Sequence, residues 1–335
     1  MLGDRSYRPF TPIPSEHMTT IRALTHSGYF HPDEVTAYAI LRQADKQVDG
    51  SFVRSRDPAL IAQATIVFDV GGIYDPEKGR YDHHMPTDRA PKRHDGSLYS
   101  SAGLIWRDFG RDALKSMASN QGSDGLGADD IEANIEELWS RIDHAFIRQI
   151  DRIDTGEEKS APMSYADQID TFNPNWTEES SADVQFQAAA DFAADTLRRV
   201  TKRELAHIRS RNFVLEAHAA SADPRILELP RSMPWQGVVQ SEDLPVAYAT
   251  YEKDGDWMIA AMPSSPGGHD QRVSLPREWA GLRDADIQAA TGVSDAVFVH
   301  AARFCGAARS KAGALEMAVK ALDHAQHPDG DPATG

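Results

Sequence analysis

A short apolar run at residues 64–72, ATIVFDVGG, constrains the fold of this chain more than any other segment. It is continuous rather than alternating, and it ends in Asp69 and two glycines. Such a run is typical of a parallel strand that is buried on both faces and presents a residue at its carboxyl end. Strand and helix patterns alternate around it as far as about residue 155. We therefore expect an α/β domain whose mainly parallel sheet is flanked by helices.

The remaining elements follow from the same periodicities. Further strands are expected at residues 20–24, 52–57, 246–252, 257–263 and 296–301. Helices are expected from about residue 33, from an N-cap at Ser100 or Ser101, and at residues 131–154, 183–212 and 311–325.

Two domains are expected, because 335 residues exceed the usual size of one. The first α/β domain should occupy residues 19–160, and a connecting helical region 161–215 should lead to a smaller C-terminal α/β domain at 216–328. Residues 1–18 are expected to be a flexible lead-in and residues 329–335 a frayed tail.

The charge and the cysteine content exclude several classes of function. A net charge of −16 argues against a general grip on long duplex nucleic acid, but a small phosphorylated substrate can be reached through bound cations. The single Cys305 excludes an internal disulfide and a thiolate zinc site. Neither a signal peptide nor a membrane span is apparent, so we expect a cytoplasmic protein without a membrane partner. The oligomeric state stays open.

Histidines and aspartates gather in four places in the first domain. Each has a plain structural explanation when taken alone, as a turn residue, a helix-terminus charge or a solvated helix edge. A carboxylate placed after a buried strand is costly, however, unless it is paired or bound to metal. Together the groups offer the mixed nitrogen and oxygen ligands of a two-metal site for phosphoryl chemistry. They are His26, His31 and Asp33; Asp69; Asp82, His83 and His84; and Asp151 with Asp154.

The ligand set indicates two divalent cations. It contains too many histidines for a site dedicated to magnesium and no thiolate. Manganese is therefore the first choice, with magnesium or cobalt as substitutes.

These motifs resemble the DHH phosphoesterase superfamily and, within it, the melanocyte-proliferating-gene (Myg) family of metal-dependent phosphohydrolases. The resemblance spans roughly residues 20–325. It rests on THSGYFHPDE, FDVGGIYDPEKGRYDHH, SSAGLIW, FNPNW, LPREWAGLRD and FVHAARFCGAARSKAGALEMA, in the order of the family.

The resemblance implies an N-terminal DHH-type domain that binds two cations and a C-terminal domain that closes over the substrate. It implies that His26 and His31 hold one cation and that Asp33 and His83 hold the other. Asp69 would bridge both cations, and Asp154 or Asp151 would complete the second site. Asp82 would orient a histidine, and His84 would face the phosphate. The pattern favours Asp154, which Thr-Gly follows, without deciding between the two aspartates. Pro32 and the single Gly306 depart from the family pattern, and the second departure leaves the substrate uncertain.

The C-terminal half offers weaker candidates for substrate binding. Gly267, Gly268, His269 and Arg272 could bind a phosphate through backbone N–H groups and a guanidinium, or they could form a hairpin turn before a strand. Arg303 belongs to a second basic segment with Arg309 and Lys311. The basic stretch 198–211 is either a solvated helix face or a track for an oligonucleotide backbone. The six tryptophans are expected to pack in cores or between domains.

The family resemblance implies a phosphodiester hydrolase, most plausibly a 3′-to-5′ exonuclease on RNA or short oligonucleotides. Water activated between two cations would be the nucleophile. A pyrophosphatase or small-nucleotide phosphatase is the alternative enzyme. A metal-stabilised interaction protein without turnover is the alternative outside enzymes.

Overall fold

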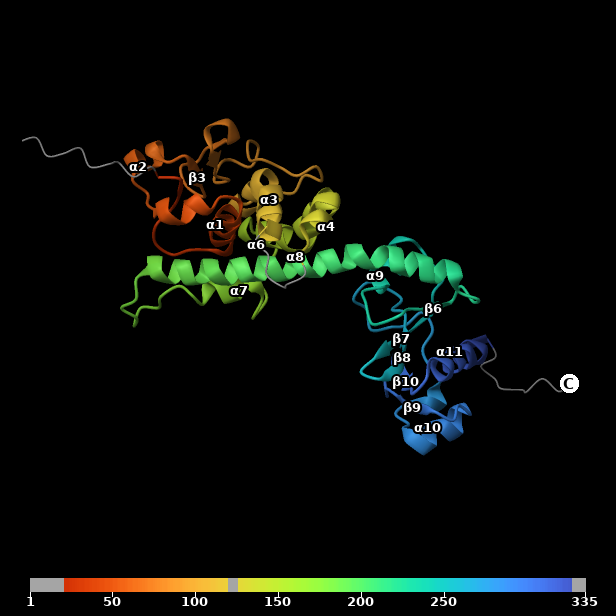
Figure 1. Ribbon diagram of the computed structural model, residues 1–335. Coiled ribbons are helices and arrows are strands. Elements are labelled where there is room, and N and C mark those ends of the chain that lie inside the picture. Colours follow the sequence, from red (N-terminus) through yellow and green to blue (C-terminus); the bar gives the residue numbers. More distant parts are fainter. Residues whose placement is uncertain (1–20, 120–125, 327–335) are drawn as a thin grey trace, which may run out of the picture. The chain divides into compact units, whose positions relative to one another are not determined.

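The computed structural model describes residues 21–119 and 126–326 of the chain (Figure 1). The chain divides into two compact units, Met1–Lys202 and Arg203–Gly335, which we call unit 1 and unit 2. The expected lead-in and tail lie outside the described residues, and the expected domain boundaries stay a prediction. No helix within the described residues is both long and apolar enough to cross a membrane.

A five-stranded sheet forms the centre of unit 1, in the order β2-β1-β3-β5-β4. Strands β2, β1, β3 and β5 run parallel, and only the edge strand β4 is antiparallel. Leu24 in β1 pairs with Val53 in β2 and Val67 in β3, so the apolar run at 64–72 is indeed an inner strand. The strands are β1 (Ala23–Thr25), β2 (Phe52–Arg54), β3 (Ile66–Phe68), β4 (Tyr74–Asp75) and β5 (Arg80–Tyr81).

Helices surround this sheet. They are α1 (Pro32–Ala44), α2 (Pro58–Gln63), α3 (Ser101–Ser119), α4 (Ala128–Ala133), α5 (Ile135–Ile142), α6 (Arg148–Asp154), α7 (Tyr165–Asp170) and the first part of α8 (Ala182–Ala220). Short helical turns lie at η1 (Lys46–Ser51), η2 (Pro76–Lys78) and η3 (Asp143–Ile147), the last of them a π-helix.

The helix expected at residues 131–154 is wrong as a single element. Asn134 leaves the helical conformation at φ −122° and ψ 18°, and its side-chain amide donates to the carbonyl of Asp130 at 2.8 Å. This local hydrogen bond competes with the helix and separates α4 from α5. A π-helical turn at Asp143–Ile147 then precedes α6.

Aromatic packing joins the sheet of unit 1 to α1 and α8. Phe52 of β2 stacks on Tyr38 of α1 with ring centroids 3.9 Å apart and on Phe186 of α8 at 5.4 Å. Phe30, just before α1, meets the edge of the same Phe186 ring. The contacts of these rings stabilise this region, and the contact between Phe30 and Phe186 joins the loop between β1 and α1 to α8.

A second five-stranded sheet, in the order β6-β7-β8-β10-β9, forms unit 2. β6 and β7 are parallel and the other pairs are antiparallel. The elements are β6 (Ile226–Glu228), α9 (Gln236–Ser241), β7 (Tyr248–Lys253), β8 (Asp256–Ala261), η4 (Arg277–Trp279), α10 (Asp284–Thr291), β9 (Ala296–Val299), β10 (Cys305–Ala308) and α11 (Lys311–Gln326). The two α/β units confirm the predicted fold class.

Strand β10 lies within the second basic segment, between Arg303 and Arg309. Gly306, in its middle, departs from the Myg pattern, and it meets a packing requirement. A Cβ at this position would lie 2.7 Å from the carbonyl oxygen of Phe298 on β9. Only glycine lets these neighbouring strands approach so closely.

Candidate metal centre

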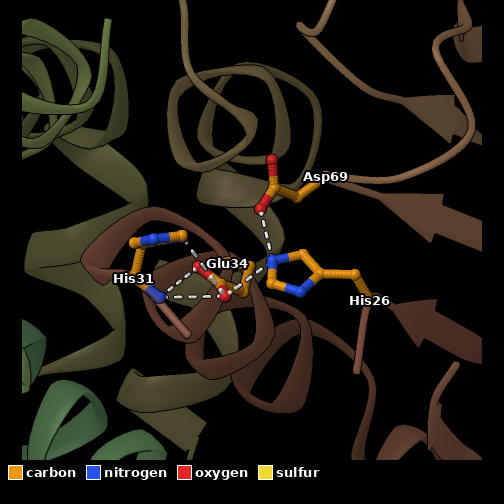
Figure 2. Close-up of side chains that lie close together, drawn as sticks. All are labelled: His26, His31, Glu34 and Asp69. Carbon is orange, nitrogen blue, oxygen red and sulfur yellow. Dashed lines mark hydrogen bonds and ion pairs between the residues drawn. The ribbon is translucent and has the colours of Figure 1, made fainter. Parts of the chain in front are cut away.

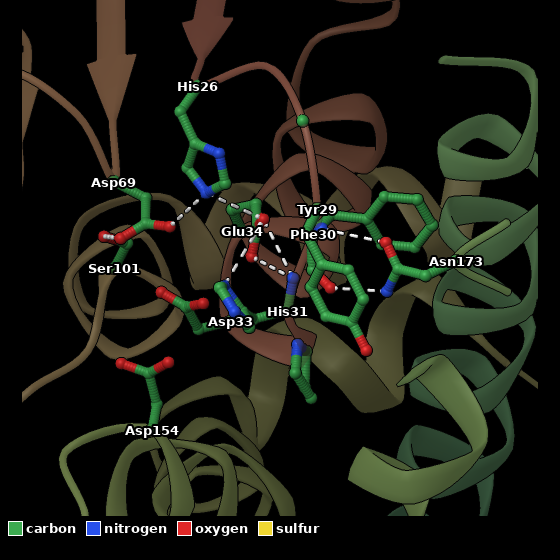
Figure 3. A network of polar contacts seen from close by, with 12 residues as sticks. His26, Tyr29, Phe30, His31, Asp33, Glu34, Asp69, Ser101, Asp154 and Asn173 are labelled. Atoms are coloured by element: carbon green, nitrogen blue, oxygen red, sulfur yellow. Dashed lines mark hydrogen bonds and ion pairs between the residues drawn. The ribbon is translucent and has the colours of Figure 1, made fainter. Parts of the chain in front are cut away.

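The predicted site residues follow three neighbouring parallel strands. His26 follows β1, Asp69 follows β3, and the Asp82–His84 segment follows β5. Because these strands are adjacent and parallel, their carboxyl ends meet at one edge of the sheet. Figure 3 shows His26 and Asp69 at these strand ends, with Asp154 on α6 facing them.

Asp69 lies at the centre of the site. Its backbone has a φ of +56°, in the left-handed region that aspartate enters more readily than most other non-glycine residues. Its carboxylate lies 3.2 Å from His26 Nε2 and 3.3 Å from His83 Nε2, and Ser101 donates to it at 3.4 Å. Burial opposes ionisation, but the two histidines outweigh it and hold the pKa of Asp69 well below its usual range.

One group of candidate ligands consists of His26, His31, Glu34 and Asp69 (Figure 2). His26 Nε2 lies 3.0 Å from Glu34 Oε1, and its Nδ1 contacts the carbonyl oxygen of Ser27 at 3.3 Å. With Nδ1 donating to that carbonyl, Nε2 is the ring nitrogen that faces the two carboxylates, and it would bind a cation there after losing its proton. His31 Nδ1 lies 4.0 Å from the same Glu34 oxygen.

Glu34 is the member that the sequence reasoning missed. Both of its oxygens accept from the His31 backbone N–H at 2.9 Å, so it also caps α1. Its side chain is fully buried, and burial raises its pKa well above the usual value despite the hydrogen bond from His26. Its position beside Asp33 in the HPDE motif was the available signal, but an acidic residue in the first turn of a helix is ordinary.

A second group consists of Asp33, His83 and Asp154. His83 Nε2 lies 3.1 Å from Asp154 Oδ2 and 3.8 Å from Asp33 Oδ2. Both carboxylate oxygens of Asp33, together with His83 Nε2 and Asp154 Oδ2, are buried without a hydrogen-bond partner among the described residues. Buried polar atoms left in this state are costly, and a divalent cation would satisfy them. The donors present therefore fit a metal centre.

The charges of the cluster lead to the same conclusion. Burial and the neighbouring carboxylates of Asp33 and Asp69 raise the pKa of Asp154 to about 10. Burial lowers the pKa of His26, but Asp69 and Glu34 more than compensate and raise it to about 10. Without cations, protons must offset the negative charge of the cluster.

Asp151 and Asp154 have different surroundings. Asp151 Oδ1 accepts from Ser100 Oγ at 2.8 Å and from the backbone N–H groups of Ser100 and Gly103 at 3.1 Å. Its other oxygen accepts from Arg93 Nη2 at 2.5 Å. Asp151 is thus saturated by the start of α3 and a buried arginine. Asp154, in contrast, joins Asp33 and His83.

Asp82 contacts His84 rather than His83. Its Oδ1 lies 2.9 Å from His84 Nδ1 and accepts from the His84 backbone N–H at 3.0 Å, while Gly72 donates to Oδ2 at 2.6 Å. His84 has a side chain that is 62% exposed. The hydrogen bond that the His84 imidazole donates to Asp82 raises the pKa of His84 despite partial burial.

A loop that follows α7 fastens the loop that carries His26 and His31. Asn173, in the FNPNW motif, accepts from the Phe30 backbone N–H at 2.9 Å and donates to the Phe30 carbonyl at 2.8 Å. Arg54 donates to the Gly28 carbonyl at 2.7 Å and pairs with Asp183 of α8 at 2.9 Å. Figure 3 shows the contacts of Asn173.

The site opens into a pocket of about 560 Å³. Its lining consists of His26, His31, Pro32, Arg56, Asp69, Val70, Gly71, Gly72, Asp82, His84, Ile150, Ile153 and Asp154. Arg56 was not singled out from the sequence, which placed it inside a strand expected at residues 52–57, whereas β2 ends at Arg54 and Arg56 follows it in a loop.

The C-terminal candidates all lie in unit 2. Gly267, Gly268 and His269 lie in a loop that an isolated β-bridge between Pro263 and Gln271 closes, and the strand that the hairpin alternative expected after the turn does not form within the described residues. Arg272 donates to the Leu244 carbonyl at 2.6 Å, and Arg303 donates to the Leu275 carbonyl at 3.2 Å. Both guanidinium groups thus have structural partners, and their role in substrate binding stays a prediction.

The basic stretch 198–211 is part of helix α8. In it, Arg199 pairs with Asp195, and Arg211 pairs with Glu242.

Trp106, Trp235 and Trp279 are buried as predicted, but Trp176 of unit 1 is 95% exposed. Core packing is therefore wrong for Trp176.

The whole chain was compared with known proteins. The family MYG1_exonuc, described as "Uncharacterised protein family (UPF0160)", matches residues 22–322. The human protein named MYG1 exonuclease is 31% identical, over 95% of this chain and 90% of its own length. A MYG1 protein of Schizosaccharomyces pombe is 30% identical, over 92% of this chain and 99% of its own. These matches confirm the family resemblance inferred from the motifs.

Among solved structures, RecJ from Thermus thermophilus in complex with Mn²⁺ matches with a TM-score of 0.28 and 15% identity. The match covers 93% of this chain and 53% of RecJ. From the extent of the family match and the similarity to its curated relatives, this chain belongs to the MYG1 family.

Proposed function

We propose that this chain is a divalent-metal-dependent phosphodiesterase of the exonuclease class. The observation that carries the proposal is the set of buried atoms of Asp33, His83 and Asp154 without hydrogen-bond partners among the described residues, beside an open pocket that Asp154 lines. Membership of a family whose human relative is named an exonuclease supports the same reaction class. The finer proposal is a 3′-to-5′ exonuclease that acts on RNA or short oligonucleotides with Mn²⁺.

Two sets of side chains would hold the cations. We assign His26, His31, Glu34 and Asp69 to one cation, and Asp33, His83 and Asp154, with Asp69 shared, to the other. When bound, divalent cations stabilise charge that develops on phosphoryl oxygens and lower the pKa of water toward neutrality.

The chain's own residues then position the substrate. Asp82 holds His84 at the pocket and raises its pKa, which favours the imidazolium form. With Nδ1 engaged by Asp82, Nε2–H is the donor left for a phosphoryl oxygen. Asp151 stabilises the structure in this proposal, because its oxygens already accept from Arg93 and the start of α3.

A hydrolysis panel tests the proposal. Chelator-stripped protein is supplied with Mn²⁺, Mg²⁺ or no metal and is given 5′-labelled RNA and DNA oligonucleotides, dinucleotides and pyrophosphate. We expect a metal-dependent ladder of products from the RNA. Phosphate release from pyrophosphate alone would replace the exonuclease with a pyrophosphatase. Two bound metals without turnover of any substrate would favour a non-catalytic interaction protein.

His83→Ala provides the matched test of the site. We expect kcat to fall roughly 100-fold or more, because the variant removes a ligand that reaches Asp33, Asp69 and Asp154. The control is His94→Ala, which removes an exposed histidine outside the pocket lining. Full activity of the His83 variant would overturn the two-metal assignment.

A further inference from the structure

We propose that Arg56 forms a phosphate subsite that binds the phosphodiester next to the one attacked. The inference rests on the proposed function and gives it a specificity: a strand with at least two linkages should bind better than a substrate with one phosphate. It concerns a residue outside both ligand groups.

The position of Arg56 brings it to the rim of the site. It lies two residues after the end of β2, at the sheet edge where β1 delivers His26, and it lines the pocket. Its Nε donates to the Ser27 carbonyl at 3.4 Å, the same oxygen that His26 Nδ1 contacts at 3.3 Å. The guanidinium therefore lies one carbonyl away from a metal-ligating ring.

Arg56 is the only lysine or arginine in this lining, all of which belongs to the described part of unit 1. The four carboxylates assigned to metals carry as many negative charges as two divalent cations carry positive ones. Asp82 adds a further negative charge at the pocket. With both cations bound and with His84 facing the attacked phosphate, Arg56 supplies a fixed positive charge that the next phosphate of a chain would meet beside the site.

Arg54 and Arg56 differ in whether their guanidinium groups have donors left to bind a phosphate. The Arg54 side chain is 2% exposed, pairs with Asp183 and stacks over the Phe186 ring at 4.6 Å. Arg56 is exposed, and its five N–H donors make one long hydrogen bond among the described residues. Its remaining donors can bind a phosphate bidentately.

The exposure of Arg56 also decides which phosphate it takes. The attacked phosphate must lie against the buried atoms of Asp69 and Asp33, where cations and His84 neutralise it. An arginine at the rim instead meets the next linkage of a strand that leaves the pocket. The competing explanation is that Arg56 only braces the Ser27 carbonyl.

A cycle of protein and substrate changes distinguishes these explanations. Wild type, Arg56→Gln and Arg56→Lys are compared on a trinucleotide and on its two analogues in which one linkage is an uncharged methylphosphonate. The readouts are kcat/KM, KM and kcat for the normal linkage, and the affinity and stoichiometry for Mn²⁺ by calorimetry. The control is Lys78→Gln, an exposed cation that pairs with Asp75 outside the pocket.

We expect Arg56→Gln to lower kcat/KM for the trinucleotide about 10- to 100-fold, mainly through KM, with Arg56→Lys intermediate. On the analogue whose neutral linkage adjoins the cleaved one, the same variant should have less than a twofold effect. Mn²⁺ binding should match wild type in all variants.

Equal losses on the charged and neutral substrates, or weakened Mn²⁺ binding, would show that Arg56 braces the loop and would overturn the subsite. Unchanged kinetics on the trinucleotide would overturn it as well. If the wild type cleaves no oligonucleotide, the proposed function fails and takes this inference with it. If the wild type cleaves and only the Arg56 cycle fails, the proposed function stands.

Discussion

Two aspartates three residues apart on α6 should respond in opposite ways to the loss of their charge. Asp151→Asn removes the carboxylate that pairs with buried Arg93, which also pairs with Asp143 at 2.5 Å. Asp154→Asn removes a carboxylate from the candidate metal centre. The two variants therefore separate structural stability from metal binding with the same chemical change.

The expected cost of Asp151→Asn is a loss of stability. Breaking a buried ion pair costs about 3–5 kcal/mol when the remaining charge is left without a partner, but Arg93 keeps its pair with Asp143, which places the cost at the low end. The amide oxygen of asparagine can still accept from Ser100 and Gly103, so we expect about 3 kcal/mol. For a unit of this size that corresponds to a Tm lowered by roughly 6–12 °C. Mn²⁺ affinity of the folded protein should stay within about threefold of wild type.

Asp154→Asn should leave the metal-free protein nearly as stable as wild type. Burial and the neighbouring carboxylates raise the pKa of Asp154 to about 10, so the metal-free side chain is protonated at pH 7 and resembles asparagine in shape. We expect a change below about 1 kcal/mol. Loss of a residue that only orients a metal ligand costs about 10- to 100-fold in metal affinity. Because Asp154 is assigned as a ligand itself, Mn²⁺ affinity should fall by at least that factor.

Thermal unfolding in chelator and calorimetric titration with Mn²⁺ measure both quantities on the same samples. The reasoning would be refuted if Asp151→Asn lost metal affinity while its Tm stayed at the wild-type value. It would equally be refuted if Asp154→Asn bound two equivalents of Mn²⁺ as tightly as wild type.

Two further predictions concern the same cluster. Glu34→Gln should weaken one of the two Mn²⁺ equivalents at least about 10-fold, whereas the amide oxygen of Gln can still accept from the His31 backbone N–H and keep the cap of α1. Calorimetry with two unchanged equivalents would show that Glu34 only caps α1. Mn²⁺ binding at pH 7 should release protons, because His26 and Asp154, each with a pKa raised to about 10, hold protons in the metal-free state, and affinity should therefore rise with pH. Calorimetry in buffers of different ionisation enthalpy measures the release, and identical heats in every buffer would contradict this prediction.

Sequence reasoning predicted residues that the structure brings together in the candidate site, because strand ends are a one-dimensional signal. Asp69 and His83 each follow a short apolar or β-prone segment, and parallel strands bring such positions to one edge. The choice between Asp151 and Asp154 needed three dimensions, since both lie on the same short helix. Arg93, which distinguishes them, lies 58 residues earlier in the chain.

Other residues escaped because their local pattern had a commoner meaning. Glu34 looks like an ordinary first-turn acid, and Arg56 lies in a segment that was expected to be a strand. The break at Asn134 was hidden because the apolar spacing continues through it, whereas the side-chain hydrogen bond to Asp130 does not depend on that spacing. The exposure of Trp176 could not be inferred from its residue type, which is usually buried.

The fastening of the metal loop by Asn173 has a consequence for the order of assembly during synthesis. The backbone of Phe30 makes its two hydrogen bonds with Asn173, a residue 143 positions later in the chain. Arg54 likewise pairs with Asp183, which is synthesised much later. A nascent chain that has displayed the whole ligand set through Asp154 still lacks these contacts. The loop that carries His26 and His31 therefore becomes fixed only after the start of α8 has emerged from the ribosome. We expect the candidate site to reach its full affinity for cations only at that later stage.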